Sequence, residues 1–204
     1  MKPELQNIAI GLAQHQLVKV GEFKLSSGIM SPYYVDLRAM PSHPELFDRV
    51  TDAYAAELKS SGLAFNRIVG VATAGVPIAT LVAYKLKKPF LYVRKEERNH
   101  GTKSLVEGVI EPGEPVIVVD DVVTTGGNLL RTIEALREKG AKVEYVLVLV
   151  DREQGASENL AKIGVKLIAL LTSSELIREL YLKGLVGKED YEKVINYIGG
   201  DKGV

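Results

Sequence analysis

The fold of this 204-residue chain is decided by the stretch from Val116 to Gly140, which reads VIVVDDVVTTGGNLLRTIEALREKG. Its first four residues, 116–119, are apolar and β-branched, which is typical of a strand buried on both faces of a parallel sheet. From Asn128 onward the apolar residues recur at helical spacing, and Gly140 supplies a stop signal after a basic last turn. The stretch therefore predicts a buried strand, a glycine-containing turn and a helix.

The turn between this strand and helix, Thr-Thr-Gly-Gly-Asn at residues 124–128, has the composition of a phosphate cradle. Backbone N–H groups at a helix N-terminus attract anions, glycines let a ligand approach the backbone, and threonines add hydroxyl donors. Asp120 and Asp121 end the strand at the edge where open α/β sheets bind ligands. Because paired acids repel a further phosphate, they suit sugar hydroxyls or a metal-bound substrate. An ordinary strand-to-helix connection with solvated acids is the alternative interpretation.

This motif closely resembles the 5-phosphoribosyl-1-pyrophosphate (PRPP) motif of type I phosphoribosyltransferases. The resemblance implies that the two acids hold the ribose hydroxyls and belong to the catalytic residues, and that the loop binds the 5′-phosphate. The residues that it assigns to PRPP here are Asp120, Asp121, Val122, Val123, Thr124, Thr125, Gly126, Gly127 and Asn128. The motif identifies a donor substrate but not the acceptor.

The composition indicates a globular protein of ordinary charge. With 46% hydrophobic and 25% charged residues, the chain is long enough for one domain with a sizeable core. Lys plus Arg and Asp plus Glu each number 26, so the charge balance gives no argument for a nucleic-acid or membrane partner. The absence of cysteine excludes disulfides and thiolate sites and is compatible with a reducing compartment. Since no stretch resembles a signal core or a membrane span, we expect a cytoplasmic protein.

Residues 1–40 predict a helix followed by a hairpin. Apolar residues share one helical face over residues 3–19, and residues 23–28 and 31–38 alternate as two short strands joined by a glycine-containing turn. From spacing alone, the tyrosines, the acid and the arginine of the second strand are explained by cross-strand packing and a surface ion pair. The pattern by itself therefore requires no functional role.

The sequences KLSSG at 24–28 and SPYYVDLR at 31–38 nevertheless resemble the N-terminal hood of the orotate phosphoribosyltransferases, which join orotate to PRPP. The resemblance points to orotate as the acceptor. One departure is Ser26, because many family members carry lysine there and use it at the active site. Lys24 lies on the same strand face, and neither residue is assigned to the site.

A second strand, turn and helix precede the central stretch. Residues 44–61 have the pattern of an amphipathic helix, residues 67–72 that of a strand, and residues 73–87 that of a glycine-containing turn leading into a helix. In the resembled family this turn surrounds the pyrophosphate of PRPP, often through backbone atoms, so its Thr-Ala-Gly sequence is chemically adequate. Residues 89–93 then predict another apolar strand.

The segment 94–103, RKEERNHGTK, is too hydrophilic for a core and predicts an exposed loop in which five of ten residues are Arg, Lys or His. A solvated charged loop is the plain alternative, but the departing pyrophosphate needs charge neutralisation. The segment resembles the catalytic lid of the orotate enzymes, which usually have lysine at the position of Arg98. The resemblance implies that a lid at about 95–107 reaches across a homodimer into the partner's site. It assigns to PRPP Arg94, Lys95, Arg98 and His100, the last three also as catalytic residues.

Arg152 follows a long apolar strand at residues 143–150 and therefore lies on the ligand edge of the sheet. Its planar fork can bind a carboxylate or carbonyl bidentately, whereas a salt bridge to Asp151 or Glu153 is the open alternative. In the resembled enzymes the matching arginine grips the base, so the resemblance assigns Arg152 and Thr124 to orotate. The rest of the chain predicts helices at 156–163, 174–183 and 188–198, a strand at 165–171 and a frayed tail.

The chain is thus identified as a member of the type I phosphoribosyltransferases, by motifs that cover nearly its whole length. The fold expected is α/β, a doubly wound and mainly parallel sheet flanked by helices, with a small N-terminal hood. We expect one domain over residues 1–204, with the hood at about 1–40 and the core at about 41–198.

The resemblance implies that orotate displaces pyrophosphate from PRPP, giving orotidine 5′-monophosphate in de novo UMP synthesis. Mg²⁺ is the expected cofactor, carried mainly by PRPP without direct protein ligands. The expected partners are PRPP, orotate and a second copy of the chain, with no nucleic acid and no membrane. A purine or uracil phosphoribosyltransferase, or a non-catalytic PRPP-binding regulator, remains open as an alternative.

Overall fold

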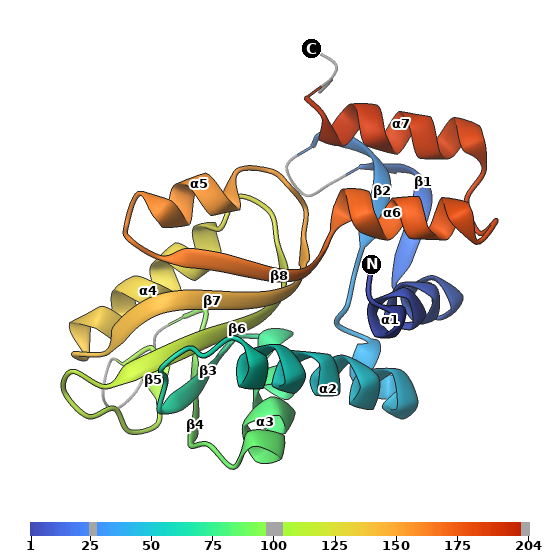
Figure 1. Ribbon diagram of the computed structural model, residues 1–204. Helices are drawn as coiled ribbons and strands as arrows, with labels where there is room; N and C mark the ends of the chain where they lie inside the picture. The colour runs from blue at the N-terminus through green and yellow to red at the C-terminus, as the bar shows by residue number, and fades with distance from the viewer. Residues whose placement is uncertain (25–27, 97–103, 201–204) are drawn as a thin grey trace.

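A six-stranded sheet forms the centre of the computed structural model, which describes residues 1–24, 28–96 and 104–200 (Figure 1). Its strands are β3 (Arg67–Val71), β4 (Phe90–Val93), β5 (Val106–Glu107), β6 (Pro115–Val123), β7 (Lys142–Asp151) and β8 (Lys166–Thr172). In space they follow the order β5-β4-β3-β6-β7-β8, and every neighbouring pair is parallel except β4 and β5. The prediction of a mainly parallel sheet is confirmed.

Helices cover both faces of this sheet, as a buried parallel sheet requires. They are α2 (Pro44–Ser60), α3 (Gly75–Leu86), α4 (Gly127–Glu138) and α5 (Ala156–Ala161). The first two pack on one face and the last two on the other (Figure 1). Side chains of β6 alternate between the two cores, with Ile117 and Val119 on the α2 and α3 side and Val116 and Val118 on the α4 and α5 side. The continuous apolar run of β6 follows from this double burial.

The chain reverses its direction across the sheet between β3 and β6. From β3 it passes through α3 to β4, whereas from β6 it passes through α4 and α5 to β7 and β8 on the other side. The turns at 72–74 and 124–126 therefore meet at the carboxyl edge of two adjacent strands. Open α/β sheets bind ligands at such a switch point.

The N-terminal and C-terminal elements pack together beside the carboxyl edge of the sheet (Figure 1). The elements gathered there are α1 (Pro3–Gln14), the antiparallel hairpin β1 (Val18–Lys24) and β2 (Met30–Val35), the short helix η1 (Met40–Ser42), α6 (Ser173–Leu182) and α7 (Lys188–Ile198). The Tyr33 ring meets the Tyr197 ring edge-on at 6.3 Å, and Gln6 donates to Glu179 at 3.3 Å. The N-terminal hairpin is thus packed against C-terminal helices that the sequence pattern did not link to it.

The N-terminal helix is shorter than the prediction over residues 3–19. It ends at Gln14, and Gln16 adopts a φ of +56°, a left-handed conformation that does not continue a helix. Val18 then pairs with Val35 in the hairpin. Leu17 and Val18, which the predicted helix included, instead belong to the hairpin connection and its first strand.

The strand predicted over 116–119 is longer than expected. β6 remains paired with β7 as far as Val123 and Asp151, so the ladder continues past the acidic pair. Asp120 and Asp121 therefore lie within the strand and not after it, where ladder hydrogen bonds fix their backbone.

Candidate active site

Asp120 lies where the start of α3 closely approaches β6. Its side chain is 7% exposed, and its Oδ1 accepts the backbone N–H of Asp121 at 3.0 Å. A Cβ at Gly75 would lie 2.7 Å from Asp120 Oδ1 and 2.8 Å from the Val119 carbonyl oxygen, so only glycine permits this approach. From α2, Tyr54 Oη donates to the Asp120 carbonyl oxygen at 2.7 Å. The acid is thereby held between two helices.

The surroundings of the acidic pair favour protonation. Burial raises the pKa of Asp120 well above its usual range and the Asp121 charge raises it further, whereas the charge of Lys95 lowers it. Burial also raises the pKa of Asp121. The pKa of Tyr54 is raised by burial and by both acids. A ligand that offers hydroxyl donors or positive charge would therefore favour the ionised form of the pair.

The turn after β6 presents backbone donors at the start of α4. Gly126 adopts a φ of +86°, and a Cβ at Gly127 would meet no atom within 4 Å, so this turn faces open space. The first N–H groups of a helix have no partner within it. Asn159 of α5 donates to the Thr125 carbonyl oxygen at 3.0 Å and holds the turn from behind. This arrangement suits an anion, as the sequence predicted.

The predicted lid at about 95–107 is anchored at both of its ends. The Arg94 N–H donates to the Leu105 carbonyl oxygen at 2.9 Å, and Arg94 Nη1 lies 3.3 Å from Glu107 Oε1. Residues 106 and 107 form β5 on the edge of the sheet, so they are part of a strand and not of a loop. Two lid residues assigned from the sequence, Arg98 and His100, lie outside the described residues.

A cavity of about 50 Å³ joins the base of the lid to the first turns of α4. Its lining residues are Val71, Ala72, Val93, Arg94, Lys95, Leu105, Asn128, Arg131 and Thr132. Arg131 donates from Nη2 to Asn128 Oδ1. The sequence interpretation missed Arg131 and Thr132, although their spacing of three and four residues from Asn128 places them on the same helix face.

Arg152 is a buried cation at the same edge, with 6% exposure. Its Nε donates to Tyr33 Oη at 3.2 Å and its Nη2 to Ser31 Oγ at 3.4 Å. The alternative of a salt bridge to Asp151 or Glu153 is not realised, because among the described residues no carboxylate lies within ion-pair distance of Arg152. A buried, unneutralised guanidinium is a suitable site for an anion.

Most of the predicted site residues lie at the carboxyl edge of the sheet, but they differ in how far their side chains are exposed to a ligand. Thr124 is exposed, whereas Val123 is 3% exposed and packs in the core. The Val123 carbonyl oxygen accepts the Arg152 N–H at 2.9 Å. Val123 therefore orients Arg152, and its side chain cannot meet a ligand.

The surface ion pair expected from spacing alone lies just after β2, which ends at Val35 and not at residue 38 as predicted, since Arg38 Nε donates to Asp36 Oδ1 at 2.7 Å. The Tyr34 ring stacks on Phe23 with centroids 5.6 Å apart, which is the expected cross-strand packing. Tyr33, by contrast, points to Arg152, and spacing gave no signal of that contact. Lys24 is exposed at the end of β1, and Ser26 lies outside the described residues.

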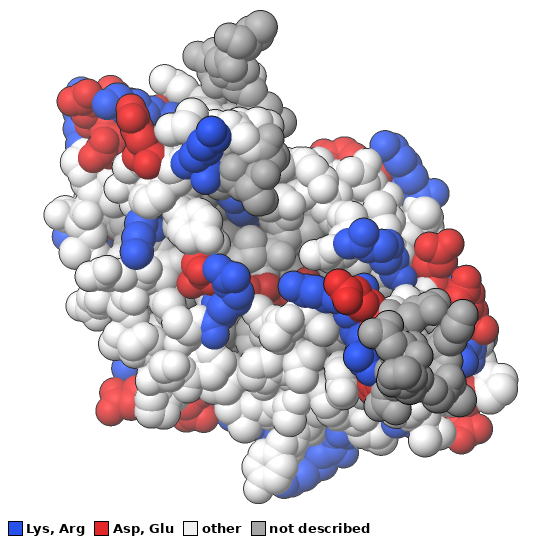
Figure 2. Space-filling view, turned by 180° about the vertical axis from the view of Figure 1, so that it is seen from behind, with Lys and Arg blue, Asp and Glu red and all other residues white. Residues whose placement is uncertain are grey.

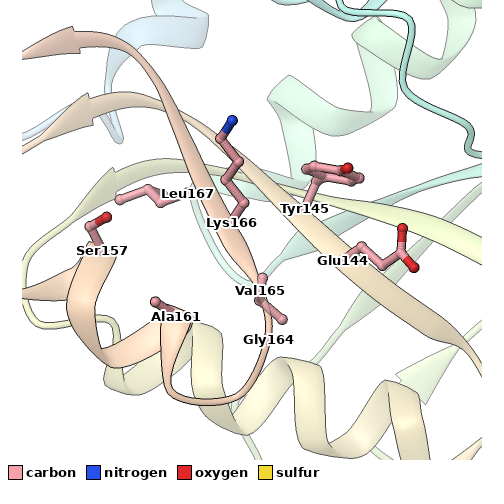
Figure 3. Close-up of a pocket in the computed structure, with 8 residues that line it drawn as sticks. All are labelled: Glu144, Tyr145, Ser157, Ala161, Gly164, Val165, Lys166 and Leu167. Carbon is pink, nitrogen blue, oxygen red and sulfur yellow. The ribbon is translucent and has the colours of Figure 1, made fainter.

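Another cavity lies away from this edge and has different chemistry (Figure 3). It measures about 530 Å³ and lies between α5 and the amino-terminal parts of β7 and β8, where Tyr145 and Lys166 stand. Arg152 follows the opposite end of β7. On the face drawn in Figure 2, acidic and basic side chains lie close together around a hollow near the middle. The chemistry of the carboxyl edge, and not cavity size, therefore locates the candidate site.

Comparison with known proteins gives consistent matches. Residues 39–175 match the phosphoribosyl transferase domain family. The chain is similar to the orotate phosphoribosyltransferase of Sulfolobus acidocaldarius, with 43% identity over 92% of this chain and 93% of that protein. It is also similar to that of Pyrobaculum aerophilum, with 45% identity over 89% of this chain and 92% of that protein.

Solved structures show the same similarity. The chain matches the orotate phosphoribosyltransferase of Aeropyrum pernix with a TM-score of 0.76 and 39% identity, over 88% of this chain and 99% of that one. It matches Leishmania donovani UMP synthase with a TM-score of 0.86 and 31% identity, over 95% of this chain but 42% of that one. It matches the Mycobacterium tuberculosis orotate phosphoribosyltransferase in complex with PRPP with a TM-score of 0.69 and 27% identity, over 85% of this chain and 99% of that one.

The raised pKa of Asp120 predicts a pH-dependent gain of stability in Asp120→Asn. Because the pKa of this acid is higher in the folded than in the unfolded chain, its ionisation destabilises the fold as pH rises through the folded value. At pH 8 the amide should raise the melting temperature by about 2–6 °C, and the difference should vanish below about pH 4, where both states bind the proton. Thermal unfolding at several pH values measures this.

The control is Glu134→Gln, which replaces an exposed carboxylate on α4 and should change stability by less than about 0.5 kcal/mol at either pH. A lower melting temperature of Asp120→Asn at pH 8 would show that the ionised acid stabilises the fold.

Proposed function

This chain belongs to the orotate phosphoribosyltransferase family, and we propose how its residues transfer the 5-phosphoribosyl group of PRPP to orotate, as a step of de novo UMP synthesis. A ring nitrogen of orotate forms the new bond to the anomeric carbon, and the bond from that carbon to the pyrophosphate oxygen breaks. The products are orotidine 5′-monophosphate and pyrophosphate. Since orotate is already an anion, the reaction needs positioning and charge stabilisation more than a strong base.

The acceptor assignment depends chiefly on one observation, the buried guanidinium of Arg152 without a carboxylate partner among the described residues. An arginine in this state favours a ligand that supplies a negative charge with fork geometry, and the carboxylate of orotate does so. Uracil lacks that group. Thr124, exposed at the start of the turn, is the second contact to the base that we propose.

The donor occupies the switch point between β3 and β6. Asp120 and Asp121 hold the ribose hydroxyls, which supply the donors that paired carboxylates need. The turn 124–128 binds the 5′-phosphate through the first N–H groups of α4, with the open space at Gly127 as support. Val122 and Val123 contribute backbone only, because the Val123 side chain is buried and the Val122 side chain packs against the core on the α2 and α3 side.

The pyrophosphate is stabilised by cations at the base of the lid and within it. Arg94 and Lys95 line the cavity beside α4, and the Lys95 charge acts on Asp120. Arg98 and His100 are proposed from the sequence alone. Preorganised positive charge stabilises the charge that develops on the leaving group, and this is usually the largest contribution of a protein to catalysis.

Mg²⁺ is proposed as a cofactor that arrives with PRPP. Among the residues that the structure describes, no group of three or more His, Asp or Glu side chains could hold a metal ion. Mg²⁺ usually keeps several waters and binds substrate phosphates, so an ion carried mainly by PRPP needs no set of direct protein ligands. When bound, the ion supplies positive charge to the pyrophosphate.

A homodimer is proposed, in which the lid of each chain completes the partner's site. The anchoring of Arg94 to Leu105 and Glu107 limits the part that can reach across to residues between these anchors. One domain over residues 1–204 and a cytoplasmic location are likewise proposals from the sequence. Within the described ranges, no helix is long and apolar enough to cross a membrane.

A base panel tests the assignment. With PRPP and Mg²⁺, orotate should lose its absorbance and release pyrophosphate, because its carboxylate matches Arg152. Adenine, hypoxanthine and uracil should not react at comparable rates. Saturable turnover of one of these bases with none of orotate would establish the purine or uracil alternative. No pyrophosphate from any base, together with binding to RNA or DNA, would establish the regulator.

Arg152→Ala should weaken the binding of orotate more than the binding of PRPP. The lost charge-assisted contact is worth roughly 1.5–3 kcal/mol, or about 10- to 150-fold in affinity. Asp121→Asn should instead impair use of the donor. Titration of each ligand against both variants measures the difference, with Arg178→Ala on the exposed side of α6 as the matched control. Normal orotate binding with lost PRPP binding in Arg152→Ala would reverse the roles.

The shared lid predicts complementation between two inactive variants. Lys95→Ala should reduce turnover on the order of 10²- to 10³-fold, by analogy with the loss of one preorganised donor. In a mixed dimer with Arg152→Ala, both lesions fall in one site and the other site is sound. After random exchange, half of the dimers are mixed, so activity should recover to roughly a quarter of wild type.

The exchange of subunits between dimers is first verified by mass labelling. If exchange is complete and the mixture stays as inactive as the separate variants, the lid serves its own chain.

A further inference from the structure

We infer that Tyr33 and Ser31 on β2, with Ser173 at the start of α6, are positioning residues that orient the Arg152 guanidinium and thereby set the affinity for orotate. The inference rests on the proposed function and extends it to residues that belong to the hood and to the C-terminal helices. None of the three is required to touch PRPP.

The hydrogen bonds form a chain with a defined direction. Tyr33 Oη donates to Ser173 Oγ at 3.2 Å, which leaves its lone pair to accept Arg152 Nε at 3.2 Å. Ser31 Oγ donates to the Tyr33 carbonyl oxygen at 2.7 Å, which leaves its lone pair to accept Arg152 Nη2 at 3.4 Å. Because each hydroxyl has its proton committed elsewhere, each presents only an acceptor to the guanidinium.

Burial disfavours any other orientation of the Arg152 guanidinium. Tyr33 and Ser173 are fully buried, Ser31 is 1% exposed and Arg152 is 6% exposed. If the guanidinium rotated away, hydroxyl oxygens and N–H groups would be left without partners in a region that water does not reach, which is costly. The Arg152 Cζ also lies 4.6 Å from the Tyr33 ring centroid, so the ring restricts the plane of the fork.

The cluster orients the charge without neutralising it. All acceptors that Arg152 meets among the described residues are neutral hydroxyls, and two of its five N–H groups are used. The remaining donors belong mainly to Nη1, for which no acceptor occurs in the described part of the chain. A carboxylate in place of the hydroxyls would compete with an anionic ligand, whereas hydroxyls leave the full charge available.

The neighbouring acids, Asp151 and Glu153, bind backbone N–H groups and not the Arg152 guanidinium. Glu153 adopts a φ of +57°, which is uncommon for a residue with a side chain. Its N–H donates to Asp151 Oδ1 at 2.9 Å, and its carboxylate accepts the Ser174 N–H at 2.8 Å at the start of α6. Arg152 is therefore fixed on both sides, by β6 through Val123 and by α6 through Glu153.

Tyr33→Phe tests the orienting bond, because it keeps the ring and removes only the hydroxyl. The KM for orotate should rise about 10-fold, the typical effect of losing one hydrogen bond to a charged group, while the Kd for PRPP stays within twofold. Tyr197→Phe is the matched control. It removes a hydroxyl from the ring that packs edge-on against Tyr33, and should leave both constants unchanged. Steady-state kinetics and PRPP titration supply the readouts.

A double-mutant cycle separates positioning from direct contact. In an Arg152→Ala background, Tyr33→Phe should change the KM for orotate by less than twofold, because the group through which it acts is gone. An equal effect in both backgrounds would mean that Tyr33 touches the base itself or supports the fold in general, and the inference would be lost. Ser173→Ala, expected to raise the KM about 2- to 5-fold, gives the same cycle if Tyr33→Phe does not fold.

The two proposals fail in different ways. If the wild-type enzyme does not use orotate at all, the proposed function is wrong. If it uses orotate and the cycle shows no coupling, the function stands and only the positioning role is overturned.

Discussion

The site depends on the parallel pairing of β6 with β7 up to their last residues. Register between Val123 and Asp151 brings the acidic pair and Arg152 to one edge, because Arg152 is the next residue and donates its N–H to Val123. Had the ladder ended at Val119, the acids would lie in a flexible turn. Ladder hydrogen bonds instead fix the backbone of two adjacent acids at a place where burial disfavours their ionised forms. The fixed geometry of the pair therefore lowers the stability of the fold.

Local sequence was sufficient for features that local chemistry decides. The apolar run before Asp120, the glycine turn and the periodicity after Asn128 predicted a buried strand, an anion-suited turn and a helix, and the sheet is mainly parallel as expected. The alternation of strands and helices also placed Arg152 at the ligand edge. Boundaries were less accurate, since Gln16 and the β6 ladder respond to packing that periodicity does not contain.

The features that were missed join residues far apart in sequence. Tyr54 meets Asp120 from another helix, and Tyr33 reaches Arg152 and Ser173 across more than a hundred residues. Nothing in the pattern of β2 distinguishes an inward tyrosine that orients an arginine from one that fills a core. Arg131 was passed over because a basic residue on an exposed helix face is ordinary.

The packing of the hairpin against α6 and α7 has a consequence for biosynthesis. Contacts such as Gln6 with Glu179 and Tyr33 with Tyr197 join elements that are synthesised early to α6 and α7, which are synthesised later. The sheet can assemble while the chain is still growing, and α1 can pack on α2. Neither α1 nor the hairpin can make its contacts with α6 and α7 until those helices emerge. The pocket for the base is therefore completed last, and a nascent chain acquires its donor-binding edge before it can select an acceptor.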